Sequence, residues 1–215
     1  MEEKISKFVL EEATYVLVGA WNTAILNPKW IASEILKLPQ GTSIPMELAV
    51  GPAMSVRAKI ADLYFIPSSD KLIINPSKED EELFKLADTA INTLYNTLPY
   101  TPIEAIGYNF LYELEENEDF AVDINFEASR YNELYKTINA SAGHESTIQH
   151  SLSLNNDAYV VLNLLLKKSG KKNLLSMNYH YQTSNDKGKI KHSLNNFYSN
   201  FKHSQLTTSK LIKKR

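Results

Sequence analysis

The sequence predicts an α+β protein made of two lobes of antiparallel sheet, each with helices packed on one face. Segments of alternating apolar and polar residues recur along the 215-residue chain and are typical of strands with one buried face. Between them lie stretches whose apolar residues repeat every three or four positions, as on the buried side of a helix. An apolar fraction of 43% and a charged fraction of 22% are ordinary for a globular protein.

Runs rich in β-branched and aromatic residues predict the strands of the first lobe. These runs cover residues 14–21, 44–50, 56–66, 71–74 and 103–114. Between the strands, Asn27 and Pro28 form a favourable helix start. Ser77, with Asp80 three residues later, resembles a capping box and predicts a second helix. This order of elements suits a ferredoxin-like, split βαβ arrangement for residues 1–117.

A second α+β lobe is predicted for residues 118–205. Its expected elements are a strand at 121–126, a helix at 127–138, a strand at 146–154, a hairpin at 158–183 and a C-terminal helix. The apolar stripe of that helix should cover the apolar face of the second hairpin strand. The stripe on the helix consists of Ile190, Leu194, Phe197 and Phe201. The apolar face of the strand consists of Leu175, Met177, Tyr179 and Tyr181. Residues 206–215 keep little periodicity and are expected to form a frayed, basic tail.

The boundary between the two lobes is predicted from composition. All eight prolines lie between Pro28 and Pro102. Residues 160–215 contain 12 of the 23 basic residues but only one of the 25 acidic residues, Asp186. An acidic body is thus followed by a basic end, and the most polar stretch between them is 115–119.

No local motif predicts catalysis. The chain has no cysteine, and its seven scattered glycines form no phosphate-binding loop. His144, Glu145 and His150 lie close in sequence, but two strand histidines six residues apart are about 20 Å from each other, too far to share a metal ion. We therefore expect no cofactor, no metal site and no enzyme activity. A catalytic site assembled from scattered residues stays an alternative.

Two sets of residues are candidates for binding. The polar side of the second hairpin strand carries Ser176, Asn178, His180 and Gln182, which form either a recognition row or the hydrated face of a sheet. The second set is basic and consists of Lys167, Lys168, Lys171 and Lys172 at the hairpin tip and Lys187, Lys189 and Lys191 in the next connection. These lysines could face nucleic-acid phosphates, an acidic partner or the acidic lobe of the chain itself.

These observations favour a non-catalytic interaction protein, a subunit or regulatory partner of a larger cytoplasmic assembly or a homo-oligomer. The bipolar charge favours oriented association, and the 12 tyrosines belong to a residue type enriched at interfaces. The alternative is a nucleic-acid-binding accessory protein that contacts the phosphate backbone through its basic end. A cytoplasmic location without membrane contact is expected, because the N-terminus lacks the apolar segment of a secretory signal and no apolar run is long enough to span a bilayer.

Overall fold

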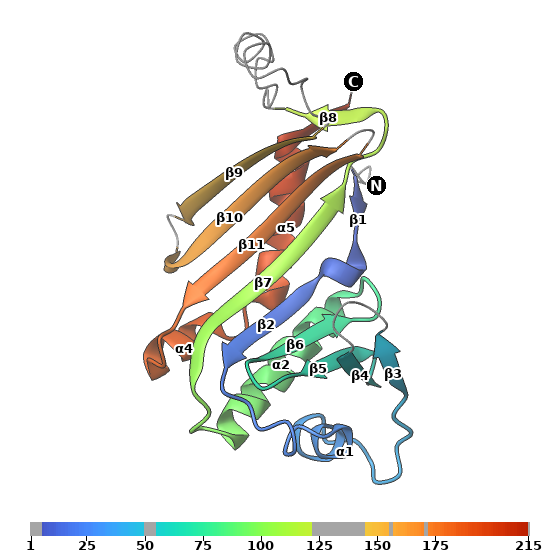
Figure 1. Cartoon of the computed structure of the whole chain (residues 1–215), viewed down its shortest axis with the longest axis vertical. Helices are drawn as coiled ribbons and strands as arrows, with labels where there is room; N and C mark the ends of the chain where they lie inside the picture. The colour runs from blue at the N-terminus through green and yellow to red at the C-terminus, as the bar shows by residue number, and fades with distance from the viewer. Residues whose placement is uncertain (1–5, 50–54, 122–144, 155–156, 170–171, 215) are drawn as a thin grey trace, which may run out of the picture.

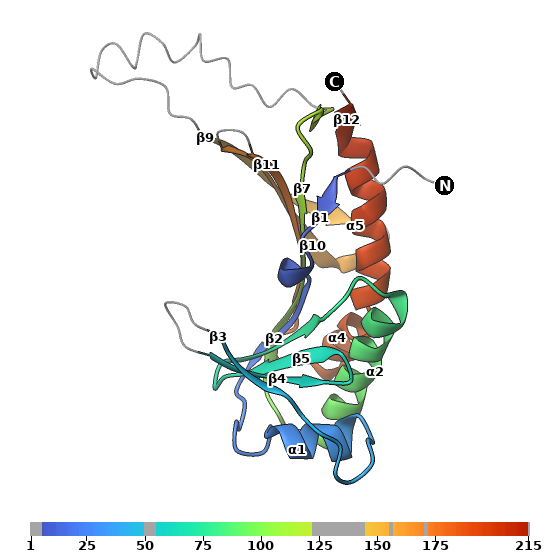
Figure 2. The ribbon, with the colours of Figure 1, turned by 90° about the vertical axis from the view of Figure 1, so that its right-hand side faces the viewer.

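The computed structural model describes residues 6–49, 55–121, 145–154, 157–169 and 172–214. Its main feature is a large antiparallel sheet with helices on one face, so the predicted α+β class is confirmed (Figure 1). Seen edge-on, the sheet is curved, and its concave side points away from the helices (Figure 2). Among the described residues, no helix is long and apolar enough to cross a membrane.

The strands of the sheet follow the order β3-β4-β5-β6-β2-β7-β11-β10-β9, and β1 also pairs with β7. Their bounds are Lys7–Phe8 (β1), Thr14–Gly19 (β2), Met46–Ala49 (β3), Ser55–Ile60 (β4), Leu63–Pro67 (β5), Lys71–Pro76 (β6), Ile103–Glu113 (β7), Glu145–Leu154 (β9), Asp157–Ser169 (β10) and Lys172–Gln182 (β11). A separate pair joins β8 (Glu118–Phe120) to β12 (Ile212–Lys214).

Two long helices cover the convex face of the sheet (Figure 2). They are α2 (Glu81–Thr97) and α5 (Phe197–Leu211), and shorter helical segments are η1 (Leu10–Glu12), α1 (Pro28–Trp30), the π-helical turn η2 (Ile31–Ile35) and α4 (Lys187–Ser193). The predicted start of α1 is confirmed, because the Asn27 side chain accepts a hydrogen bond of 3.0 Å from the Trp30 N–H and Pro28 takes the first helical position.

Strand β7 joins the two halves of the chain. It pairs with β2 on one side and with β11 on the other, so strands from residues 1–117 and 118–205 lie in one sheet. Strands β6 and β7 flank β2, both run antiparallel to it, and α2 connects them, which makes one split βαβ unit. A complete ferredoxin-like lobe is not confirmed, and the division into two lobes stays a prediction.

An aromatic cluster forms the core between the sheet and the helices. Phe197 at the start of α5 is fully buried, with ring centroids 4.9 Å from Phe84, 5.6 Å from Tyr15 and 5.7 Å from Phe110. Next to it, Phe201 stacks on Phe84 at 4.2 Å. The expectation that the C-terminal stripe covers the apolar face of β11 is confirmed, because both sets of residues are buried in one core.

A buried carboxylate fixes the start of α5. Asp88 projects from α2 and accepts hydrogen bonds from the backbone N–H groups of Phe197 at 3.0 Å and Tyr198 at 3.1 Å. These donors belong to the first turn of α5, and backbone N–H groups in the first turn of a helix have no acceptor within that helix. Burial outweighs the two donors and raises the pKa of Asp88 to about 6.

Four expectations were wrong in detail. The run at 56–66 is a hairpin of β4 and β5, because Ala61 and Asp62 both have positive φ angles, as a two-residue reversal requires. Helix α2 begins after Asp80, whose side chain accepts from the Glu82 N–H, and not at Ser77. The C-terminal helix is two helices, since Asn195 turns the chain with a φ of 63°.

The last of the four concerns the C-terminus. Residues 206–214 do not fray, because α5 continues to Leu211 and β12 pairs with β8. Ile212 is buried there. Apart from Ala121, the predicted strand at 121–126 and the helix at 127–138 lie outside the described residues.

Candidate binding face

Neither of the long helices α2 and α5 lies on the concave side of the sheet, where Figure 2 shows only the short turn η1 near the middle of the described sheet. Side chains alternate along each strand, so the residues between the buried ones point to this side. On β11 the alternation is regular, with Leu175, Met177, Tyr179 and Tyr181 buried and the residues between them half-buried. We call this side the open face. The predicted placement of Ser176, Asn178 and His180 opposite the buried row is confirmed.

Five polar side chains form a row across the middle of the open face. They occupy directly opposed positions on five neighbouring strands, so that the pairing of the sheet brings them together. From β2 to β9 they are Thr14, Asn109, Asn178, Asn163 and Ser151. We call this row the amide ladder. Only Asn178 was predicted as a binding residue.

The side chains of the amide ladder are hydrogen-bonded to each other in one direction. The Ser151 hydroxyl donates to Asn163 Oδ1 at 2.7 Å, and Asn163 Nδ2 donates to Asn178 Oδ1 at 3.0 Å. Asn178 Nδ2 then donates to Asn109 Oδ1 at 2.7 Å, and Asn109 Nδ2 donates to the Thr14 hydroxyl at 2.9 Å. Aligned donors of this kind polarise one another and strengthen the chain.

The ladder still has capacity to bind. A side-chain amide has two N–H donors and an oxygen with two lone pairs. In the ladder each asparagine uses one N–H and one lone pair, which leaves one donor and one acceptor on each of the three amides. Gly107 lies beside Asn178, and a Cβ atom there would lie at an ordinary contact distance of 3.4 Å from Asn178 Nδ2.

Rows that mix apolar and polar side chains border the ladder on both sides. The next row on one side includes Val16, His180 and Val161, and the next row on the other includes Leu111, Ser176 and Leu165. All six are only partly buried or exposed. The middle of the open face is therefore an uncharged polar row between rows that mix apolar and polar side chains. Depletion of charged residues is typical of the centre of a protein interface.

Two side chains of the predicted recognition row form hydrogen bonds within the chain. His180 Nε2 lies 3.2 Å from Gln182 Oε1, and Gln182 Nε2 donates to the backbone oxygen of Glu104 at 3.1 Å. Both side chains have other hydrogen-bonding atoms. Their role in binding stays a prediction.

The two predicted groups of lysines lie at opposite ends of β11 (Figure 1). At the hairpin tip, Lys168 forms an ion pair of 3.1 Å with Asp119, and Lys172 forms one of 3.0 Å with Glu113. Lys167 is half-buried, and Lys171 lies outside the described residues. At the other end, Lys187, Lys189 and Lys191 belong to α4. The structure therefore does not join the tip lysines and the α4 lysines into one basic surface.

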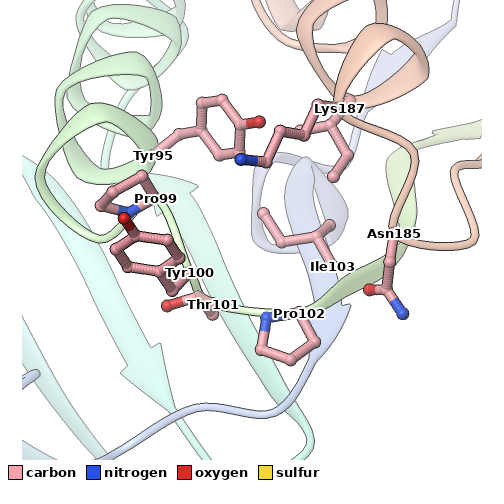
Figure 3. Close-up of a pocket in the computed structure, with 9 residues that line it drawn as sticks. Tyr95, Pro99, Tyr100, Thr101, Pro102, Ile103, Asn185 and Lys187 are labelled. Carbon is pink, nitrogen blue, oxygen red and sulfur yellow. The ribbon is translucent and has the colours of Figure 1, made fainter.

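Lys187 also lines a small cavity of about 310 Å³ where α2, β7 and α4 meet (Figure 3). Its Nζ atom lies 5.9 Å from the centre of the Tyr100 ring, which is 90% exposed. Tyr95, Thr101 and Asn185 are the other polar side chains of the described lining. No carboxylate or histidine belongs to this described lining.

Replacing Asn178 by alanine is expected to lower the free energy of unfolding by about 1–2 kcal/mol, because two ladder hydrogen bonds are lost at once. Urea denaturation of the purified protein measures this loss. The Asn109→Ala change should have a smaller effect in the Asn178→Ala background than alone, since the bond between the two amides is already absent. Ser176→Ala is the matched control on the same strand face, and strictly additive losses would contradict a coupled ladder.

Among the described residues, no group of three or more His, Asp or Glu side chains is placed to hold a metal ion. No protein-family model matches the chain, and no curated protein is detectably similar to it.

Proposed function

We propose that this chain is an interaction protein that holds an extended polypeptide segment of a partner protein on its open face. The amide ladder is the observation that carries this proposal. Each ladder asparagine offers one free N–H and one free oxygen lone pair, the same two groups that a peptide unit presents. The row crosses five strands and is about 19 Å long, enough to lie along about six extended residues.

The position of the asparagines also supports a binding role. Asparagine is depleted in strands, and three asparagines at directly paired positions are unfavourable for a sheet that needs only to be stable. Side chains such as threonine or valine would suit a hydrated sheet face better. The ladder uses these unfavourable residues at the centre of the face, where Val16, Val161, Leu111 and Leu165 supply apolar contacts for a partner.

Charge favours a polypeptide over nucleic acid as the partner. The ladder and the two rows beside it contain no Lys, Arg, Asp or Glu side chain. Affinity for nucleic acid depends mainly on cations at the phosphates. Of the tip lysines, Lys168 and Lys172 already pair with the chain's own carboxylates.

Photochemical cross-linking in the cells of origin tests the proposal. A photoreactive phenylalanine derivative at Ser176, on the open face, should give one dominant adduct with another protein, which peptide mapping identifies. The matched control is Ser199, an exposed serine on α5 at the opposite side of the sheet. With the partner in hand, Asn178→Leu should weaken binding by tenfold or more, about 1.4 kcal/mol.

Three results would refute the proposed function. They are an absence of adducts from position 176, the same adducts from positions 176 and 199, and adducts that contain only a second copy of this chain. Gel-shift binding to DNA or RNA that survives the Asn178→Leu change, and disappears when Lys187, Lys189 and Lys191 become glutamate, would instead establish the nucleic-acid alternative.

A further inference from the structure

Strand β9 is an outer strand of the described sheet, and its composition does not protect its free edge from pairing with another strand. Natural sheets block edge pairing with short strands, prolines, lysines or bulges. The other outer strand, β3, follows this rule, since it has four residues and comes directly after Pro45. Strand β9 has ten residues and contains no proline, lysine or glycine. Its pairing with β10 is regular from Glu145 to Ser153, and the irregularity of this pair lies at its end, next to Leu154. About half of its backbone N–H and C=O groups point away from β10 and can accept another strand.

We propose that β9 pairs with β9 of a second copy of this chain, antiparallel and centred on His150. One sheet would then run continuously through both copies. This inference is independent of the proposed function, because it concerns the edge of the sheet and not the open face.

The sequence of β9 complements itself in this register. In an antiparallel pair centred on residue 150, directly opposed residues have numbers that sum to 300 and lie on the same face of the sheet. On the face that carries the helices, Ile148 then meets Leu152 of the second copy. Leu152 is 42% exposed in the single chain, and Ile148 is partly buried against the core, so both gain an apolar contact.

The other face of the pair is polar throughout. Gln149 meets Ser151 of the second copy, and Thr147 meets Ser153, so each hydroxyl or amide lies opposite another. No lysine, arginine or aspartate occurs in the ten residues, so between residues 147 and 153 no like-charged carboxylates or ammonium groups face each other. A register centred on Gln149 would place Ile148 opposite His150 and lose the apolar pair.

The two-fold axis of such a dimer is perpendicular to the sheet. Both open faces would then point to the same side, with Ser151, the end of the amide ladder, next to the junction in each copy. A partner with two copies of a binding segment could therefore engage both copies at once.

Single-cysteine cross-linking tests the register sharply, because the natural chain has no cysteine. The His150→Cys variant should form a disulfide-linked dimer under mild oxidation, since directly opposed Cα atoms lie about 4.5–5.5 Å apart. Gln149→Cys and Ser151→Cys should not cross-link alone, because each lies diagonal to its own copy at about 7–8 Å. A mixture of these two variants should form the mixed disulfide.

Light scattering of the unmodified protein should show a dimer, and Leu152→Lys should convert it to a monomer. The matched control is Leu206→Lys, which changes a somewhat more exposed leucine on α5 and should leave the dimer intact. Circular dichroism checks that each variant is folded. A natural chain that is monomeric up to its solubility limit overturns the proposal. So does cross-linking of Gln149→Cys or Ser151→Cys alone that equals that of His150→Cys.

Discussion

Replacing Phe197 by alanine is expected to lower the free energy of unfolding by about 3–5 kcal/mol. The side chain is fully buried, and four aromatic rings surround it, those of Tyr15, Phe84, Tyr108 and Phe110. Large neighbouring rings cannot move enough to fill the space, so the loss includes a cavity as well as the lost burial. Urea denaturation followed by circular dichroism measures the change.

The control for this prediction is the next residue of the same helix. The Tyr198 hydroxyl donates to Glu81 at 2.7 Å, and the Lys85 ammonium lies 4.9 Å from its ring centre, both on the outside of the core. Tyr198→Ala should therefore lower the free energy of unfolding by about 1 kcal/mol or less. Equal losses for the two variants would show that α5 does not insert Phe197 into the core.

The second large effect concerns the buried carboxyl group of Asp88. Its pKa of about 6 in the folded protein lies above the ordinary value of 3.8. The folded state therefore binds this proton more tightly than the unfolded state does. The resulting stabilisation is fully present below about pH 4 and is lost as the pH rises through about 6. The difference of about two pH units corresponds to about 3 kcal/mol.

Comparison with Asp88→Asn isolates this contribution, because the amide does not ionise. Between pH 4 and pH 7, the natural protein should lose about 3 kcal/mol relative to the Asn variant. Asp70→Asn is a control whose pH dependence should have the opposite sign. Hydrogen bonds from the Ser68 hydroxyl and its own backbone hold the pKa of the exposed Asp70 carboxyl below its usual range. A difference between natural protein and Asp88→Asn that does not change with pH would contradict the cause assigned to the shift.

Periodicity predicted the elements whose pattern is local. The alternation of β7 and β11 and the apolar stripe of α5 depend on which residues lie two, three or four positions apart, so the sequence displays them directly. The errors have local causes too. Ala61 and Asp62 turn the chain without glycine or asparagine, and Leu194 and Phe197 keep helical spacing across the break at Asn195.

The amide ladder could not have been predicted from one strand. Alternation alone puts Asn109, Asn163 and Asn178 on the polar sides of their own strands. Whether they meet depends on strand order and on register, and a shift of one residue in any pair would separate them. Those quantities are set by contacts between residues up to 95 positions apart, as in the bond from Asn109 to Thr14. The same dependence on strand order explains why the sequence did not reveal that the tip lysines and the α4 lysines lie at opposite ends of β11.

The place of β7 between β2 and β11, inside the sheet, has a consequence for synthesis of the chain. One side of β7 finds its partner, β2, among residues that have already been made, whereas the other side needs β11, about sixty residues later. Until then, nascent β7 exposes a long strand edge of the kind that pairs with other chains. Completion of the sheet must await synthesis of β11, and such distant pairing slows folding.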